Sequence, residues 1–255
     1  MIPKKLHYIW LGKNPLPEMV EKCIESWKEK CPNYEIVRWD ESNLDINCCD
    51  YCKEAYENKK YAFASDVLRY KVLYEQGGIY LDVDVMLYKN LDNLLTNRVF
   101  MGFEENGIVN PGLICGAEKG NEDVYNLYSQ YKNKHFVFRD GKFNYQTICD
   151  ITTKYLKENG LTQEDQIQKI KSITIYPVEY FCPYNFKTKK LNKTENSYSV
   201  HLYLASWTPK LNFFQKIKNS IKVFIVKIIK FFVGEKKFND IMEKRREKRA
   251  QWQKK

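Results

Sequence analysis

Two aspartates, Asp82 and Asp84, stand one residue apart in an otherwise apolar stretch that follows a pair of glycines. Because side chains alternate along a strand, a strand through this stretch would turn both carboxylates to the same side. Burying two like charges together is costly, and a divalent cation removes that cost. Hard oxygen ligands suit Mn²⁺ or Mg²⁺. The alternative is a strand end where two aspartates meet water, and the pair alone leaves it open.

The segment before the pair, residues 62–76, has the pattern of a helix that stops at the two glycines. At about 100° per residue, Lys71 and Glu75 share a solvent-facing side, whereas Asp66 and Arg69 fall on the opposite, apolar side. A buried ion pair that holds the helix to a sheet would explain them. We favour a second interpretation, in which both reach a polar ligand beside the aspartate pair, because perturbed charges gather at functional sites.

Three stretches carry a resemblance to a known family. Residues 62–84 read A-x-A-S-D-x-L-R-x-x-x-L-x-x-x-G-G-x-Y-x-D-x-D, residues 2–12 form an apolar block that ends in I-W-L-G, and residues 201–207 read H-x-x-x-x-S-W. In this order they resemble the DXD-containing glycosyltransferases of family 32, and the middle stretch is the specific one. The resemblance implies a GT-A nucleotide-sugar-binding fold and a metal-dependent, retaining transfer of a hexose from a nucleotide sugar to a glycan.

The resemblance also implies roles for single residues. Asp84 would bind the metal directly, and Asp82 would hold ribose or sugar hydroxyls, or reach the metal through water. Arg69 suits phosphate or sugar oxygens because its guanidinium is a fixed fork of donors, and Asp66 would accept hydrogen bonds from the transferred sugar. Trp10, at the tip of the first strand, would stack on uracil, which favours a UDP-sugar donor.

Further residues complete the predicted site. His201 would join the metal shell or meet the phosphate, although a core histidine fits the same strand-like run. Ser206 and Trp207 would close over the β-phosphate. Asn110 is expected on the sugar- or acceptor-facing wall, and Tyr80 is a further donor contact.

The mechanism of retention stays open between a covalent nucleophile and front-face return of the acceptor. Glu104 and Glu105 are exposed candidates without a defined geometry. Two other functions are alternatives. A haloacid-dehalogenase-type phosphatase could use Asp82 and Asp84, but its motif belongs near the N-terminus and its later acidic pair is missing. A non-catalytic membrane-binding adaptor would leave the charged Asp66/Arg69 helix unexplained.

Strand and helix patterns alternate along the chain, which predicts an α/β fold with a Rossmann-like, mostly parallel sheet wrapped by helices. The expected strands are 6–11, 34–39, 77–85, 99–103, 113–117, 172–176 and 198–204. The expected helices are 17–30, 50–58, 62–76, 121–132 and 143–158, and residues 187–197 are expected to form a loop.

The positive charge is confined to the end of the chain. Residues 208–255 hold 15 Lys and Arg against 4 Asp and Glu, a net charge of +11, whereas residues 1–207 hold 27 against 28, a net charge of −1. This shift predicts a glycosyltransferase domain over 1–207 and a basic tail over 208–255.

The tail has the pattern of an amphipathic helix. In residues 211–233, Lys216, Lys227 and Lys230 fall opposite an apolar face, and lysines interrupt every apolar run, which argues against a transmembrane span. We expect residues 211–255 to lie on an anionic membrane surface, where they would present the enzyme to a lipid-linked acceptor for surface polysaccharide assembly. A partner-docking or core-packing helix is the alternative, and no nucleic-acid partner is expected because readout motifs are missing.

The N-terminal residues lack the apolar run of a secretory signal, so a cytoplasmic protein, peripheral on the inner face of the cell membrane, is expected. In that setting the eight cysteines would be free thiols. Cys49 and Cys52 form a lone C-x-x-C, and a zinc site would need a second pair.

Overall fold

The computed structural model describes residues 1–204 except 106 and 187. The predicted tail, its boundary at residues 207 and 208, and the predicted site residues Ser206 and Trp207 lie outside the described residues. The strands are β1 (Lys5–Ile9), β2 (Glu35–Trp39), β3 (Gly78–Tyr80), β4 (Val85–Leu87), β5 (Val99–Glu105), β6 (Ile108–Val109), β7 (Cys115–Ala117), β8 (Gln168–Ile170), β9 (Ile173–Tyr176), β10 (Tyr184–Asn185), β11 (Lys190–Leu191) and β12 (Ser199–His201). The α-helices are α1 (Glu18–Lys30), α2 (Asp50–Glu57), α3 (Tyr61–Gln76), α4 (Glu122–Ser129), α5 (Ile148–Glu158) and α6 (Val178–Phe181), with a short 3₁₀ helix at Asp92–Leu94.

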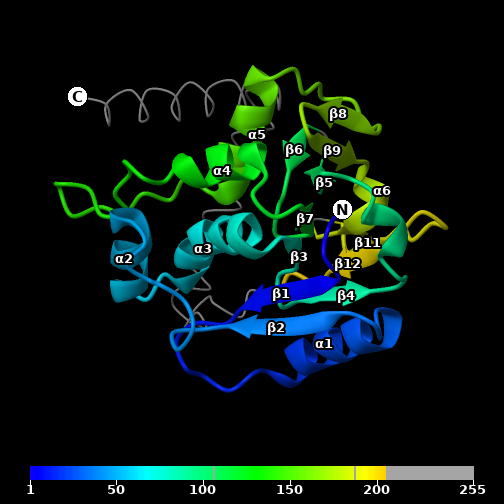
Figure 1. The fold of residues 1–255 in the computed structure, drawn as a ribbon, viewed down its shortest axis with the longest axis horizontal. Helices are drawn as coiled ribbons and strands as arrows, with labels where there is room; N and C mark the ends of the chain where they lie inside the picture. Colours follow the sequence, from blue (N-terminus) through cyan, green and yellow to red (C-terminus); the bar gives the residue numbers. More distant parts are fainter. Residues whose placement is uncertain (106, 187, 205–255) are drawn as a thin grey trace. The chain divides into compact units, whose positions relative to one another are not determined.

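The central sheet has the strand order β2-β1-β3-β7-β5-β9-β8, with β6 paired to β5 (Figure 1). The pairs β1–β2, β1–β3 and β5–β9 are parallel, whereas β7 runs antiparallel to β3 and β5, and β8 runs antiparallel to β9. Five of the seven strands on this path therefore point the same way. The predicted α/β fold with a mostly parallel sheet is confirmed, and β7 and β8 are the strands that make the sheet mixed.

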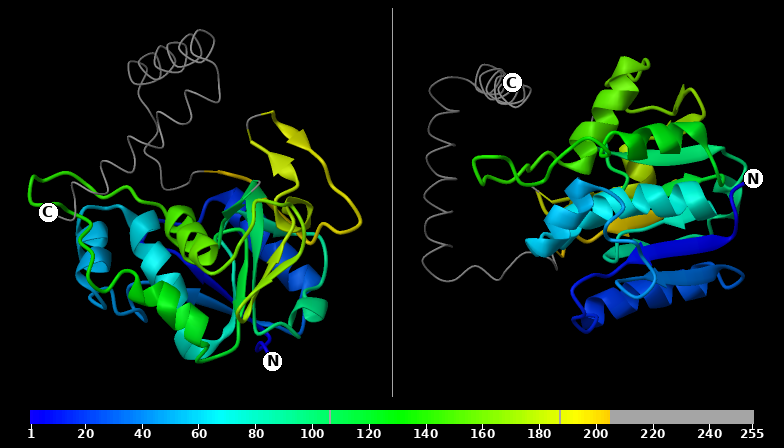
Figure 2. Two further views of the ribbon diagram at one scale, coloured as in Figure 1. Left: turned by 90° about the horizontal axis from the view of Figure 1, so that it is seen from above. Right: turned by 60° about the vertical axis from the view of Figure 1, so that its left-hand side comes forward.

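Two apolar cores lie on the two faces of this sheet. One contains inward-facing residues of α2, α3, α4 and α5 with alternate residues of β1, β5, β7 and β9. The other contains α1, the segment 79–95 and α6, with the remaining sheet residues between them. Figure 2 shows the helices packed around the sheet in this way. The two-sided burial explains why the strands read as nearly continuous apolar runs.

A second, two-stranded sheet pairs β4 with β12 in antiparallel register, with His201 opposite Val85. It forms because the chain leaves the central sheet after β3 and turns, so that β4 packs against α1 instead of continuing β3. The Trp27 indole N–H fixes this position by donating to the Val85 carbonyl at 2.7 Å. Short-range sequence patterns do not report such a pairing, and it was not predicted.

The predicted helix ends agree with the structure in part. Helix α3 stops at Gly77, whose φ of +65° is a left-handed conformation that glycine adopts without strain. Helix α5 was predicted from residue 143 but begins at Ile148, because Thr147 and Asp150 form a capping box there. The predicted loop 187–197 is also corrected, since Lys190–Leu191 form β11 and pair with β10.

Candidate active site

The two aspartates lie in the turn that connects β3 to β4. The prediction that one strand carries both is wrong, because β3 ends at Tyr80 and β4 begins at Val85. The Asp82 N–H donates to the Gly112 carbonyl at 3.0 Å, and the Val85 N–H donates to the Asp82 carbonyl at 3.0 Å, which closes the turn. The turn, not strand alternation, aims both carboxylates at the same place.

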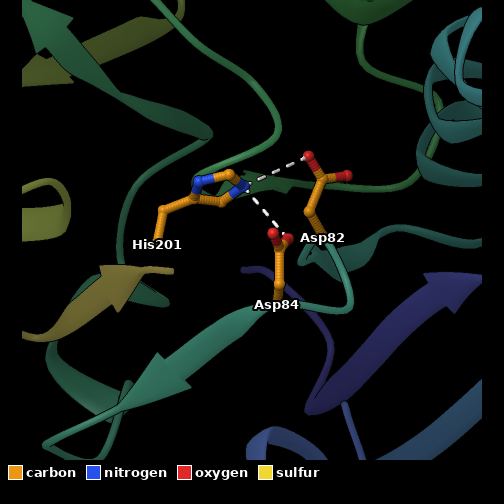
Figure 3. Close-up of side chains that lie close together, drawn as sticks. All are labelled: Asp82, Asp84 and His201. Atoms are coloured by element: carbon orange, nitrogen blue, oxygen red, sulfur yellow. Dashed lines mark ion pairs between the residues drawn. The ribbon is translucent and has the colours of Figure 1, made fainter. Parts of the chain in front are cut away.

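His201 reaches this turn from β12. Because His201 pairs with Val85, its imidazole lies beside the preceding aspartate, with Nε2 3.1 Å from Asp84 Oδ1 and 3.9 Å from Asp82 Oδ2 (Figure 3). The chain after His201 also wraps Asp84. The Leu202 N–H donates to the Asp84 carbonyl at 2.9 Å, and the Leu204 N–H donates to Asp84 Oδ2 at 2.8 Å.

Helix α3 supplies the charged pair that the sequence singled out. The Arg69 guanidinium contacts both Asp66 Oδ1, at 2.9 Å, and Asp82 Oδ1, at 3.2 Å, and it lies 4.6 Å above the Tyr80 ring. The Tyr80 hydroxyl donates to Asp82 Oδ1 at 3.0 Å. Both members of the pair are buried. Arg69 therefore links helix α3 to the aspartate turn. Both predicted interpretations hold in part, because the ion pair is buried and also lies beside the aspartates.

Gly112 makes this close packing possible. A Cβ at this position would lie 2.1 Å from Asp82 Oδ2 and 3.0 Å from Arg69 Nη1, so any larger residue would displace the carboxylate. Asn110, two residues earlier, accepts the Gly112 N–H at 2.7 Å through its side-chain oxygen. The predicted wall residue Asn110 thus lies next to the aspartate turn.

All eight predicted site residues within the described part of the chain line one cleft of about 530 Å³. They are Trp10, Asp66, Arg69, Tyr80, Asp82, Asp84, Asn110 and His201. Trp10 follows β1 and the aspartate turn follows β3, and these two strands are parallel neighbours. The cleft therefore opens at the carboxyl ends of parallel strands, where ligands bind in α/β sheets.

Glu104 and Tyr203 line the same cleft, and sequence reasoning missed their arrangement. The Glu104 carboxylate accepts the Tyr203 hydroxyl at 2.9 Å and the Asn110 amide at 3.2 Å, so it is less exposed than predicted. The Tyr203 ring packs edge-on against His201, with centroids 4.2 Å apart, and its φ is +52°. The only sequence signal for Tyr203 was its place between His201 and Trp207 in the closing block.

Burial and neighbouring charges shift the pKa values of three site residues. Burial raises the pKa of Asp84, but its hydrogen bond and charge interaction with His201 outweigh burial and hold the pKa below its usual value. For His201, burial lowers the pKa, but Asp84 outweighs it, so the pKa is raised. Burial raises the pKa of Asp66 to about 7, against the opposing charge of Arg69.

Asp82, Asp84 and His201 form the one group of three or more potential metal ligands found within the described residues. One donor atom from each lies within 4.8 Å of the others, so small side-chain rotations would place them around one ion with bonds of about 2.1 Å. Carboxylates suit Mg²⁺ and Mn²⁺, and an imidazole ligand favours Mn²⁺ of the two. The donor set therefore fits the predicted divalent metal.

Comparison with known proteins also points to a glycosyltransferase. The family model "Glycosyltransferase sugar-binding region containing DXD motif" matches residues 17–101. This region contains the Asp66/Arg69 helix and the Asp82/Asp84 turn. Residues 17–101, a third of the chain, are similar to this DXD-containing sugar-binding region. The predicted resemblance is thereby confirmed through its middle block, and the first and last blocks lie outside the match.

Individual relatives are glycosyltransferases by name. Inositol phosphoceramide mannosyltransferase 3 of Schizosaccharomyces pombe is 39% identical over 54% of this chain, and an uncharacterized glycosyltransferase of Acanthamoeba polyphaga mimivirus is 27% identical over 89% of this chain. The chain spans 40% of the length of the first protein and 92% of the second. A solved glycosyltransferase, described as involved in glycosylation of the major capsid of PBCV-1, is 10% identical with a TM-score of 0.48, covering 79% of this chain and 94% of its own.

Across the other curated relatives, the chain spans 28% to 33% of their length. The family match favours a DXD-containing glycosyltransferase over the phosphatase and adaptor hypotheses. The family match does not include Trp10, Asn110 or His201, which line the cleft and whose roles stay predictions.

Proposed function

We propose that the protein is a metal-dependent, retaining hexosyltransferase that takes a sugar from a nucleotide sugar and transfers it to a glycan acceptor. The observation that carries this proposal is the convergence of Asp82, Asp84 and His201 beside Arg69 in one cleft at the carboxyl ends of β1 and β3. Three separate segments of the chain supply these groups, so their meeting is a property of the fold.

Each residue has a definite task in this proposal. Asp84 and His201, with Asp82, would hold Mn²⁺ or Mg²⁺. When bound, such an ion stabilises the negative charge of the departing diphosphate. Arg69 presents a fixed fork of donors to phosphate or sugar oxygens, and its second nitrogen, Nη1, is buried without a hydrogen-bond partner in the described part of the chain. Asp66 would orient sugar hydroxyls.

The donor is proposed to be a UDP-sugar. Trp10 is half-buried in the cleft wall, and its indole N–H is anchored on the Asn14 carbonyl at 2.7 Å. An anchored indole at this position can stack on a base. Because several relatives are named mannosyltransferases, mannose donors belong in the same test.

The acceptor is proposed to be lipid-linked. Three relatives are named inositol phosphoceramide mannosyltransferases and a fourth a mannosyl phosphorylinositol ceramide synthase, and these ceramides are lipids. The basic amphipathic pattern of residues 211–255 suits an anionic membrane surface. Among the described residues, no helix is both long and apolar enough to cross a membrane. We therefore propose peripheral binding at the inner face of the cell membrane, with surface polysaccharide as the product.

Hydrolysis of a panel of UDP- and GDP-sugars, with Mn²⁺, with Mg²⁺ and with EDTA, tests the proposal. At least one donor should be cleaved by the wild-type protein, and EDTA or Asp84→Asn should stop cleavage. Asp140→Asn is the matched control, because Asp140 is 53% exposed and pairs only with nearby Lys142. Cleavage of no donor, or equal cleavage by wild type and Asp84→Asn, would contradict the proposal.

A further inference from the structure

The hairpin β10–β11 carries apolar side chains into solvent. Phe186 is 52% exposed and Leu191 is 51% exposed, although most large apolar residues of the described body are buried. Backbone and side-chain hydrogen bonds nevertheless hold the hairpin in a defined conformation. Asn185 accepts the Thr188 N–H on its side chain at 2.9 Å, and its carbonyl accepts the Lys189 N–H at 2.8 Å. In the left-hand view of Figure 2 the two strands project from the body of the fold.

The same hairpin is strongly basic. Residues 184–193 contain four lysines and no aspartate or glutamate, while residues 1–207 as a whole are nearly neutral. Within the described residues, no carboxylate forms an ion pair with Lys189, Lys190 or Lys193. Lys189 instead lies 3.5 Å from the Phe186 ring centroid, and Lys193 lies 4.0 Å from that of Tyr88. The Lys189 ammonium, which has no carboxylate partner among the described residues, thus lies against the exposed Phe186 ring.

The hairpin adjoins the cleft. Phe186 is one of the cleft-lining residues, and its ring lies 5.5 Å from that of Tyr203, which in turn packs on His201. A molecule or surface that binds the exposed hairpin would therefore lie at the mouth of the cleft. A surface that combines lysines with an aromatic and a leucine matches the headgroup region of an anionic bilayer, where lysines meet phosphates and apolar side chains reach the acyl boundary.

We propose that the hairpin β10–β11 is a membrane-docking element that holds the mouth of the cleft against an anionic lipid surface. This surface belongs to the described body and is separate from residues 211–255. The docking itself needs no catalysis. Its consequence, delivery of a lipid-linked acceptor to the cleft, rests on the proposed function.

Vesicle flotation of the full-length protein tests the docking. Neutral vesicles of phosphatidylcholine are compared with vesicles that also contain about 30% phosphatidylserine, which gives a strong negative surface potential. The triple variant Lys189→Gln, Lys190→Gln, Lys193→Gln should bind the anionic vesicles up to about a hundredfold more weakly, since each lysine near such a surface contributes about fivefold. Leu191→Ser should weaken binding as well, because it removes apolar contact without changing charge.

The matched control is Lys119→Gln, Lys157→Gln, Lys169→Gln, which removes three exposed lysines from other parts of the surface. The control has the same net charge and the same tail, so it should bind nearly as wild type. Equal binding of the two triple variants would overturn the proposal. So would a hairpin variant that loses binding to RNA while keeping its binding to vesicles. Thermal melts of each variant verify folding.

Donor hydrolysis in solution separates this proposal from the proposed function. The hairpin lysine variant should hydrolyse a soluble nucleotide sugar with Mn²⁺ at the wild-type rate. If the wild type cleaves no donor, the enzymatic proposal fails while flotation still decides the role of the hairpin. If the two triple variants float alike while donor is cleaved, the docking proposal alone fails.

Discussion

Asp123 and Asp84 are both buried carboxylates, and their surroundings differ in a way that distinguishes structure from function. Asp123 accepts the Tyr155 hydroxyl at 2.7 Å and the Ser172 N–H at 3.0 Å, so the chain itself satisfies it. Asp84 lies in a cleft beside His201, whose Nδ1 is buried without a hydrogen-bond partner in the described region. Burial of a charge alone therefore says little. A buried charge that lines a cleft beside other charged groups, as Asp84 does and Asp123 does not, is the better sign of a ligand site.

The largest effect is expected at the cleft carboxylate. Asp84→Ala should reduce donor hydrolysis by about a thousandfold, because it removes the ligand for a charge-stabilising ion. Its free energy of unfolding should fall as well, because the Leu204 N–H and His201 Nε2 lose their buried partner, so donor hydrolysis is compared per folded molecule. Calorimetric titration with Mn²⁺ and steady-state kinetics measure the loss. Retained Mn²⁺ binding in this variant would break the comparison.

Asp123→Ala should lower stability without lowering turnover. Its loss leaves the Tyr155 hydroxyl and the Ser172 N–H unpaired in the interior, so the free energy of unfolding should fall by about 2–4 kcal/mol. Turnover per folded molecule should stay near the wild-type value. Chemical denaturation and kinetics on the same sample check both statements, and a normal stability with impaired turnover would reverse the assignment.

His7 extends the comparison to a buried histidine whose two nitrogens are both bonded. Its Nε2 lies 2.7 Å from the Gly77 carbonyl, and its Nδ1 accepts the Trp39 indole N–H at 3.0 Å. Burial lowers the pKa of His7 to about 4, so the unfolded chain binds the proton more readily than the folded one. Stability should therefore fall as the pH drops from about 6.5 towards 4, by about 2 kcal/mol at pH 5.

Denaturation of the wild type and of His7→Gln across this pH range measures the effect. The difference between the two free energies of unfolding should depend on pH only below about 6.5. A difference that does not change with pH would show that His7 contributes through packing alone.

The smallest expected effect is that of Arg69→Lys, which asks whether the buried ion pair is structural or functional. A lysine keeps the charge but loses the planar fork, so it cannot contact Asp66 and Asp82 in the same way. We expect turnover to fall about tenfold with only a small shift in melting temperature. A large melting shift with normal kinetics would place Arg69 with Asp123 as a structural residue.

Local patterns predicted most of what local chemistry determines. The helix over residues 62–76, its glycine stop and the solvent-facing Lys71/Glu75 pair follow from periodicity and appear in α3. The same helical periodicity predicted that Asp66 and Arg69 lie on the buried side of this helix, where they line the cleft. What the sequence could not indicate was the turn between β3 and β4, because the run through residues 79–87 has the composition of one continuous strand.

Non-local contacts account for the remaining gaps. The pairing of β4 with β12 brings His201 to Asp84, and no pattern near either residue reports it; only the family resemblance suggested the histidine. Glu104 was noted without geometry because its partner Tyr203 lies far along the chain. Gly112 reads as an ordinary loop glycine until the Asp82 carboxylate is seen against it.

The β4–β12 pairing has a consequence for how the protein is made. Asp82 and Asp84 leave the ribosome long before His201, and closing so long a loop is entropically costly until both strands exist. In a nascent chain that ends before β12, the proposed metal site would lack one of its three predicted ligands. Synthesis that stops before residue 199 would leave most of the central sheet but no histidine beside the aspartates. If the two aspartates and His201 hold a metal as proposed, a chain cut before β12 should bind that metal more weakly than a chain that includes it.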